Sequence, residues 1–567
     1  MSAIDWIILA GTLAFIVLYG IWKSRGTQTM KSYLLADQQL PWYHVGLSVM
    51  ATQASAITFL SAPGQAYSDG MRFIQFYFGL PLAMVVLCIT FVPAFKRLNV
   101  YTAYEFLEQR FDNKTRTLTA FLFLLQRGLS TGITIYAPAI ILSTILHVDL
   151  IYTIVFNGLI VIVYTVYGGT KAVSYTQLFQ MLIIFAGLFL AAYMVVHLLP
   201  ENVGFMDALH IAGKMDKLNA IDTSFDWNNK YNLWSGLIGG FFLQLSYFGT
   251  DQSQVGRYLT GNSVKESRWG LLMNGLVKIP MQFIILLIGT LVFSYYQFHT
   301  PPVFFNPTEV EKVRQSSYAD AFNNAEKEFN YLHEQKKLEV EKLVLAVQSE
   351  DEAAVDIAKQ NVHSVDEKAS LAREKAVDLI VKNNDRADKN DSNYVFLTFV
   401  TNQLPVGIIG LLIAIIFLAS MGSAASGLNS LASTTVVDFY KRLYHKDKES
   451  SSDVAVSRWS TVAWGLFCIA VAIFASKLGN LIEAVNILGS LFYGTILGVF
   501  LVAFYVKRVN GNQVFLAACI TEAMVIVLWK YDVMAFLWLN VWGCLSVVAL
   551  GLLFNLFQKK NPESINK

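Results

Sequence analysis

The residues whose types and spacing could do chemistry lie first in an apolar stretch at residues 46–70. Gln53, Ser55 and Thr58 interrupt this stretch with polar side chains, and a Pro-Gly pair follows them. Lipid offers backbone groups no hydrogen-bond partners, so a weakened helix at membrane depth must be buried in protein or line a cavity. A helix that breaks there exposes carbonyl oxygens that can hold a bare cation and a polar solute. The alternative interpretation is a kinked membrane span that binds nothing.

Two ionisable side chains, Asp251 and Lys278, fall within other apolar stretches. Such groups are costly in a membrane and indicate a functional site by default. An unpaired Lys278 in a cavity would favour a carboxylate-bearing solute, whereas Lys278 paired with Asp251 would favour a neutral one. Alternatively, Asp251 lies at a helix end and Lys278 extends to the membrane surface. Arg127, early in its own stretch, is expected to anchor at the lipid headgroups.

The composition predicts a membrane protein that positions these groups on apolar helices. Hydrophobic residues make up 54% of the 567 and charged residues 15%, and the mean hydropathy is +0.46. A soluble protein would not tolerate that balance, and the net charge of +2 gives no indication of nucleic-acid binding. A bilayer crossing needs about 20 apolar residues. We expect thirteen crossings, at 5–23, 43–69, 72–95, 117–146, 150–168, 176–199, 232–252, 271–298, 396–420, 457–476, 480–504, 512–530 and 532–556.

The charges in the connecting loops predict the orientation of the chain. Basic residues gather in alternate loops, for example at Lys96 and Arg97, at Lys441 and Arg442, and again near the C-terminus. Loops rich in lysine and arginine face the cytoplasm. The N-terminus is therefore expected outside and the C-terminus inside a plasma membrane, which agrees with an odd number of crossings.

One segment, residues 301–393, is too charged for the membrane and is expected on the outside. Apolar residues from Val355 to Leu379 recur there in alternating steps of three and four. That spacing places them on one helix face, and a similar face precedes it. We expect an antiparallel two-helix hairpin, with a partly disordered insertion as the alternative. Residues 200–231 form a shorter outer loop.

Several motifs together resemble the sodium:solute symporter family, which includes sodium/glucose, iodide, monocarboxylate and proline cotransporters. They occur in family order at residues 46–70, Tyr136–Ala139, Tyr167–Val173, Thr250–Leu259, Ser420–Ser430 with its continuation to Lys441, and Ile496–Leu501. The resemblance implies an all-α membrane protein with a LeuT-like fold and a broken first core helix. Its two inverted five-helix repeats would span about 43–199 and 232–504, flanked by residues 1–42 and 505–567.

The resemblance also implies a sodium site. Its ligands would be the carbonyl oxygens of Ala51, Ala54 and Ala419 and the side chains at Gly422 and Ser423. Gly422 departs from most relatives, which carry a hydroxyl there, so water or solute would supply a fifth oxygen. Read without the family, a run of small residues in a membrane helix indicates tight helix packing instead.

We do not expect the second sodium site that some relatives have. The acidic residue that they place after the glycine-rich turn is Gln177 here, and one of the paired hydroxyl positions is Ala425. The charge that would hold a second cation is therefore absent from this chain, and we expect one sodium site.

The positions that match the solute site of sugar-transporting relatives are Gln53, Ile57, Thr58, Phe76, Asp251, Lys278 and Asn486. Ile57 cannot accept a hydrogen bond, so a hexose bound as in those relatives is not expected. We expect a sodium-coupled symporter of a small organic solute, with a neutral sugar or polyol placed ahead of a carboxylate such as sialic acid or a monocarboxylate. The alternative is a sensory membrane domain that acts through a separate protein partner bound by the hairpin. No enzyme motif is present.

Overall fold

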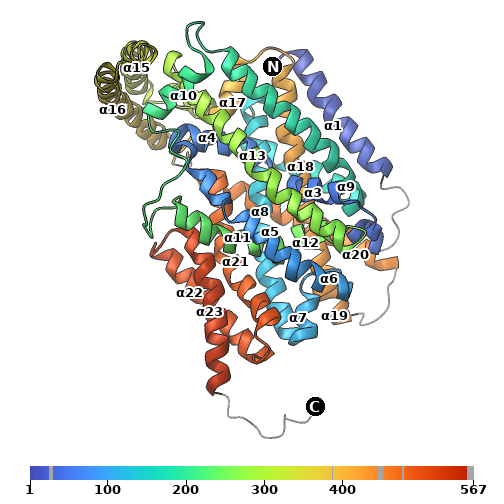
Figure 1. Ribbon diagram of the computed structural model, residues 1–567. Coiled ribbons are helices and arrows are strands. Elements are labelled where there is room, and N and C mark those ends of the chain that lie inside the picture. The colour runs from blue at the N-terminus through green and yellow to red at the C-terminus, as the bar shows by residue number, and fades with distance from the viewer. Residues whose placement is uncertain (24–29, 386, 445–450, 476–477, 558–567) are drawn as a thin grey trace, which may run out of the picture.

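A computed structural model describes residues 1–23, 30–385, 387–444, 451–475 and 478–557 (Figure 1). The regular secondary structure of the described residues is helical, and their one β-type pairing is an isolated bridge between Leu40 and Gly261, which confirms the all-α class. The first part of the chain forms α1 Ala3–Lys23, α2 Met30–Leu35, η1 Ala36–Gln38, α3 Trp42–Gln53, α4 Ala56–Asp69, η2 Gly70–Tyr77, α5 Leu80–Val86, η3 Leu87–Phe91, α6 Val92–Leu98, α7 Glu105–Arg110, α8 Asn113–Leu146, α9 Leu150–His197 and α10 Phe205–Lys214. The second part forms η4 Ser235–Gly239, α11 Gly240–Thr250, α12 Gln252–Tyr258, α13 Val264–Phe298, α14 Pro307–Arg314, α15 Ala319–Gln348, α16 Glu352–Asn383, α17 Ser392–Gln403, α18 Ile408–Thr434, η5 Thr435–Tyr440, α19 Lys441–Tyr444, α20 Ser451–Phe474, α21 Leu481–Tyr505, α22 Gly511–Lys530 and α23 Phe536–Phe557.

Ten helical segments of the described chain are long and apolar enough to cross a membrane. Thirteen were expected, and the difference has three sources. The spans at 150–168 and 176–199 join in α9 across a non-helical Gly169. The second half of the first core helix continues with the next span as Ala56–Leu98, and the segment at 232–252 is not counted among the ten. The number of crossings therefore stays a prediction.

The first core helix is broken, as the resemblance implied. Helix α3 ends at Gln53 and α4 begins at Ala56. Between them Ser55 is fully extended, with φ −88° and ψ 174°. Serine competes for backbone hydrogen bonds and favours such a start over a helix interior. The break leaves two half-helices, so that the C-terminal end of α3 and the N-terminal end of α4 meet at residues 54 and 55.

A second break separates α11 from α12 at Asp251, which has an extended backbone. The carboxylate of Asp251 caps α12 by accepting from the Ser253 amide at 2.8 Å. An aspartate at this position satisfies the free amides of a helix start. Each of the two proposed repeats therefore begins with an interrupted helix, although the repeat boundaries themselves stay a prediction.

The predicted span at 396–420 was wrong in its extent. Residues 392–403 form the separate helix α17, and the long apolar helix α18 starts only at Ile408, after Gly407 with φ +92°. A left-handed residue ends one helix and redirects the chain at small cost when it is glycine. Helix α17 packs on α4, where the backbone of Ser392 leaves no room for a side chain at Gly64.

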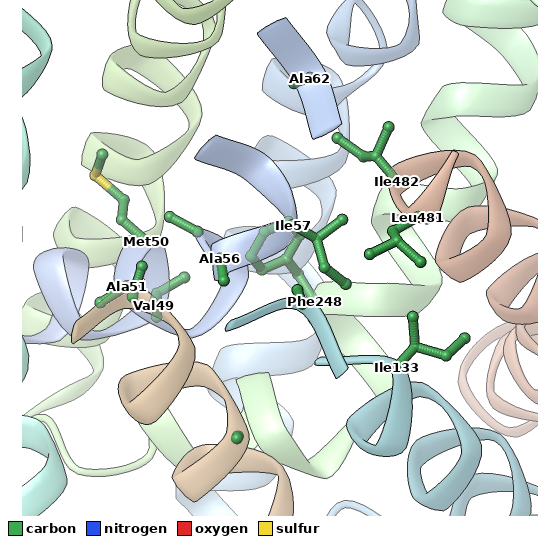
Figure 2. Close-up of a cluster of buried hydrophobic side chains, with 14 of the residues drawn as sticks. Val49, Met50, Ala51, Ala56, Ile57, Ala62, Ile133, Phe248, Leu481 and Ile482 are labelled. Atoms are coloured by element: carbon green, nitrogen blue, oxygen red, sulfur yellow. The ribbon is translucent and has the colours of Figure 1, made fainter. Parts of the chain in front are cut away.

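The expected hairpin is present as α15 and α16, which pack along each other. Figure 1 shows it beside the end of the molecule where α1 begins, while α23 ends at the opposite side. The main core is one continuous apolar cluster. Figure 2 shows its part around the first break, where Ile57, Ile133 and Ile482 from three separate helices lie close together.

Candidate functional site

A narrow cavity of about 90 Å³ lies at the break in the first core helix. Five of the seven predicted solute-site residues line it: Gln53, Ile57, Thr58, Phe76 and Asn486. Side chains from α8, α11 and α21 complete the wall, namely Arg127, Ser130, Thr131 and Thr134, then Leu243, Gln244 and Tyr247, then Ile482, Val485 and Tyr493. The structure thus brings most of the predicted residues to one place between the two broken helices, while their roles stay predictions.

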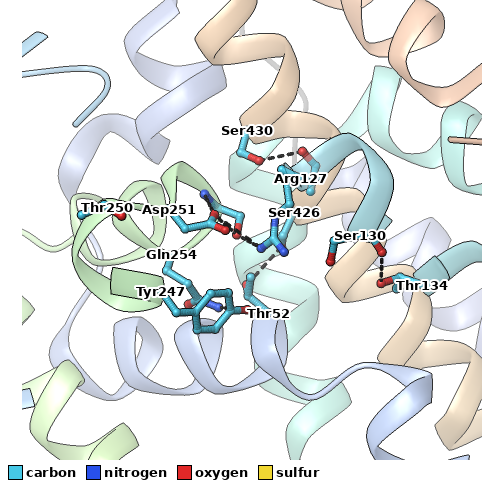
Figure 3. A network of polar contacts seen from close by, with 12 residues as sticks. Thr52, Arg127, Ser130, Thr134, Tyr247, Thr250, Asp251, Gln254, Ser426 and Ser430 are labelled. Carbon is cyan, nitrogen blue, oxygen red and sulfur yellow. Dashed lines mark hydrogen bonds and ion pairs between the residues drawn. The ribbon is translucent and has the colours of Figure 1, made fainter. Parts of the chain in front are cut away.

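Arg127 was expected at the headgroups, and this placement was wrong. Its side chain is buried and lines the cavity. One guanidinium nitrogen hydrogen-bonds the Ser253 hydroxyl, and the same nitrogen lies 3.5 Å from the Asp251 carboxylate, as Figure 3 shows. The rule that an ionisable group in an apolar span indicates function applies to Arg127 as well as to Lys278, and it would have found this residue.

Asp251 lies behind the cavity wall and does not line it. Its carboxylate accepts hydrogen bonds from the Ser253 hydroxyl at 2.6 Å and from the Tyr493 hydroxyl at 2.8 Å. The alternative interpretation, a helix-end aspartate, therefore describes its structure. A buried carboxylate needs such compensation, and here it fixes Arg127 against the Tyr247 ring at 5.7 Å.

Lys278 does not line the cavity and is not paired with Asp251. It is fully buried in α13, and its ammonium nitrogen has no hydrogen-bond partner among the described residues. The nitrogen lies 5.8 Å from the ring of Tyr77, which does line the cavity. A cation over an aromatic face is stabilised by the ring quadrupole. Lys278 thus lies beside the Tyr77 ring and outside the cavity lining, and its contact with the solute stays a prediction.

The break frees two backbone carbonyl oxygens that were predicted as sodium ligands. In a continuous helix the Ser55 amide would bond the carbonyl of Ala51, but it donates to Gln53 at 3.0 Å. The Thr58 amide would likewise bond the carbonyl of Ala54, but it donates to Ser55 at 2.9 Å. Helix geometry alone thus leaves these two oxygens available, and hard cations prefer such oxygen ligands.

The remaining predicted sodium ligands lie on α18, which packs against α3 and α4. Ser423 lines the cavity, and its hydroxyl donates to the carbonyl of Ser420 at 3.3 Å. Gly422 faces α9, where a Cβ would lie 2.6 Å from the side-chain oxygen of Gln180. Both polar atoms of the Gln180 amide are buried without a partner. A side chain at Gly422 would therefore meet the end of the Gln180 side chain.

Gln177 fills the place where the resemblance put a second cation. Its amide nitrogen donates to the hydroxyls of Thr52 at 3.2 Å and Ser426 at 3.1 Å and to the carbonyl of Gly422 at 3.3 Å. Its oxygen accepts from the Ser48 hydroxyl at 2.5 Å. An amide NH₂ group offers two donors for these three oxygens, and the Ser426 hydroxyl also donates to the carbonyl of Gly422 at 2.8 Å, so the three oxygens from α3 and α18 share hydrogen bonds without an ion.

Ser423→Ala is expected to weaken sodium binding about tenfold, or roughly 1.4 kcal/mol, because it removes a hydroxyl from the cation shell. Sodium-dependent thermal stabilisation of purified protein measures this, with folding checked in the absence of sodium. Gly422→Ser is the matched variant. The end of Gln180 can move aside, so sodium affinity should stay equal or become tighter. Unchanged affinity in Ser423→Ala would remove Ser423 from the site.

Two broken helices around a small polar cavity, with freed carbonyls beside it, define a secondary transporter of the LeuT-like class. The model of the sodium:solute symporter family matches residues 33–322 and 378–521. The chain belongs to this family, and its transport is coupled to sodium.

Relatives cover nearly the whole chain. The sodium/sialic acid symporter NanT of Aliivibrio fischeri is 25% identical over 571 residues, covering 99% of this chain and 95% of its own. The sodium/glucose cotransporter of Vibrio parahaemolyticus is 25% identical over 527 residues, covering 90% and 82%. A solved substrate-bound, outward-open sodium-coupled sialic acid symporter superposes with a TM-score of 0.75 at 23% identity, covering 98% of both chains. This last likeness supports the fold.

Proposed function

We propose that this protein is a sodium-coupled symporter that imports a carboxylate-bearing solute of the sialic acid type by alternating access. The observation that carries the proposal is Arg127. It is the charged residue among the described side chains that line the central cavity, and its Nε–H is buried without a partner. The edge of a guanidinium that presents Nε–H and an adjacent N–H matches a carboxylate with two parallel hydrogen bonds.

Asp251 makes this use of Arg127 possible. Asp251 and Ser253 both hold Nη2, the terminal nitrogen on the Nε side, so the guanidinium is fixed in place while Nε–H itself has no partner. Around it, Thr58, Ser130 and Thr131 offer hydroxyls to the same cavity, and Gln244 has both amide atoms buried without partners. These groups suit the hydroxyls and amide of a sugar acid. The earlier preference for a neutral sugar is therefore replaced, in line with the sialic acid symporters among the relatives.

Sodium and solute are coupled through the broken helix. The carbonyls of Ala51 and Ala54 belong to the same break as Thr58, and Ser423 belongs both to the predicted sodium shell and to the cavity wall. An ion that fixes the two half-helices pre-organises the solute site, so each ligand binds more tightly with the other present. We place the N-terminus and the hairpin outside and the C-terminus in the cytoplasm, and the protein in the plasma membrane.

Thermal stabilisation over a panel of solutes tests the proposal, because a ligand stabilises by its binding linkage. Sialic acid, a monocarboxylate, a hexose and a polyol are each added with and without sodium. Sialic acid is expected to raise the unfolding temperature only with sodium present. Stabilisation by the hexose or polyol and not by either acid would refute the carboxylate assignment.

The amide of Gln177 predicts a ratio of one sodium per solute. One sodium and one carboxylate carry no net charge, so uptake should not respond to membrane potential. A tenfold sodium gradient then supports about tenfold accumulation, or roughly 1.4 kcal/mol. Parallel fluxes of radioactive sodium and solute into proteoliposomes measure the ratio. Two sodium ions per solute, or an inward current, would contradict it, and Gln177→Asp is the variant expected to create a second sodium dependence.

A further inference from the structure

A second and larger cavity, of about 490 Å³, lies between the hairpin and the membrane helices. Its walls come from α4 through Tyr67, from α13 through Phe293, and from both hairpin helices. Lys217, in the connection after α10, closes one side. This volume lies within the range of roughly 300–1,000 Å³ that is typical of small-molecule sites, whereas the central cavity of about 90 Å³ has to widen to admit a solute of that size. The transport mechanism described above gives this cavity no role.

The cavity carries a net positive charge. Its lining contains Lys217, Lys336, Arg373 and Lys389, against Asp366 and Asp391. Lys389 pairs with Asp378 outside the cavity at 2.8 Å, which leaves an excess of one positive charge. Lys336 lies 2.7 Å from Asp366, and Arg373 lies 2.6 Å from Asp391. Lys217 differs from these pairs, because its ammonium donates to the Ser68 carbonyl at 2.5 Å and no described carboxylate lies within 4.0 Å of it. Burial lowers the pKa of Lys217, and the more distant charges of Asp366 and Asp69 act in the opposite direction.

An unpartnered donor or acceptor faces the same cavity. His333 is 3% exposed, and its Nε2 has no hydrogen-bond partner. Burial, together with the charge of Lys336, lowers the pKa of His333 to about 4, so the ring is neutral at pH 7. A buried polar atom without a partner costs free energy, and a hydroxyl or an amide of a bound molecule would satisfy it.

Apolar surface completes the cavity. The ammonium groups of Lys217 and Lys336 lie 5.0 and 5.9 Å from the same Phe293 ring, and Tyr67 packs edge-on against Phe293 and Phe305. Two cations close to one aromatic ring, with a neutral imidazole nearby, match a molecule with a carboxylate at one end and a polar, partly apolar body.

We propose that the hairpin cavity is a second binding site for the carboxylate-bearing solute, which is held there before it reaches the central cavity. The inference rests on the proposed function and on the outward placement of the hairpin. Helix α4 joins the two sites, because Ile57 lines the central cavity and Tyr67 lines the hairpin cavity. Ten residues of helix separate them by about 15 Å, so the two sites are distinct and both can be filled at once.

Calorimetric titration of the purified full chain with sialic acid in saturating sodium tests this. The wild type is expected to bind two molecules per chain. Lys217→Gln should weaken one of the two sites at least about tenfold, since it removes a charge-assisted hydrogen bond, and Lys217→Arg should restore it. Lys342→Gln is the control, because Lys342 is an exposed hairpin lysine paired with Glu339 and lies outside the cavity.

The double variant Arg127→Met/Asp251→Asn, which removes the central charge pair, separates this inference from the proposed function. One remaining site in that variant, abolished by adding Lys217→Gln, supports the hairpin cavity. Loss of all binding in the double variant, or two unchanged sites in Lys217→Gln, overturns it. A wild type whose binding depends on Lys217 and not on Arg127 would overturn the proposed central site and leave the hairpin cavity standing.

Discussion

Replacing Arg127 by methionine is expected to weaken binding of a carboxylate solute by about 3 kcal/mol, roughly a hundredfold. The substitution has two effects, one on solute affinity and one on the stability of the protein. The solute loses a paired, charge-assisted hydrogen bond to the guanidinium edge. In addition, Asp251 is left as a buried carboxylate whose remaining partners are the hydroxyls of Ser253 and Tyr493 and the Ser253 amide. Titration with sialic acid in sodium measures the first effect, and thermal unfolding without ligand measures the second.

A second substitution separates the two effects. Asp251→Asn added to Arg127→Met removes the stranded charge, so it should recover stability but not solute affinity. Breaking a buried ion pair from one side typically costs more than removing both partners. Affinity that returns with the double variant would mean that Arg127 only positions the helices and does not contact the solute.

Arg116→Ala is expected to destabilise the protein by about 3–5 kcal/mol, the usual range for breaking a buried ion pair. Arg116 is 1% exposed. Its guanidinium forms ion pairs with Asp438 at 2.6 Å and with Glu108 at 2.5 Å. It also donates to the Val437 carbonyl at 3.1 Å. These contacts tie the start of α8 to α7 and to η5, which follows α18. Without the guanidinium, Asp438 keeps the Thr102 hydroxyl at 2.9 Å, which does not balance a buried charge.

Arg442→Ala is the matched control, because Arg442 contacts the same Glu108 carboxylate from a more exposed position. Its loss should cost about 0–1 kcal/mol, as for surface ion pairs. Unfolding temperatures in detergent compare the two variants, and Arg116→Leu/Asp438→Leu should regain part of the stability. Equal effects of Arg116→Ala and Arg442→Ala would show that the network contributes no more than a surface contact.

The sequence by itself determined the features that depend on local chemistry. A helix interrupted by Gln53, Ser55 and Thr58 has to break where its backbone cannot be satisfied, and the break then dictates that the carbonyls of Ala51 and Ala54 lose their amide partners. The hairpin followed in the same way from apolar spacing, since residues three and four apart share one helix face whatever surrounds them. The expectation of a single sodium site also came from the sequence alone, because the amide of Gln177 cannot carry the charge of an acid.

Only the tertiary structure decided which of the three intramembrane charges face the cavity. Arg127, Asp251 and Lys278 all lie in apolar stretches, and the sequence periodicity there is too weak to fix a buried face. Their placement depends on how α8, α12 and α13 rotate against one another, which many weak packing contacts set together. That packing turned Arg127 inward onto Asp251 and placed Lys278 behind Tyr77. Arg127 and Asp251 are 124 positions apart in the chain, so the local sequence around either residue does not indicate that the two form an ion pair.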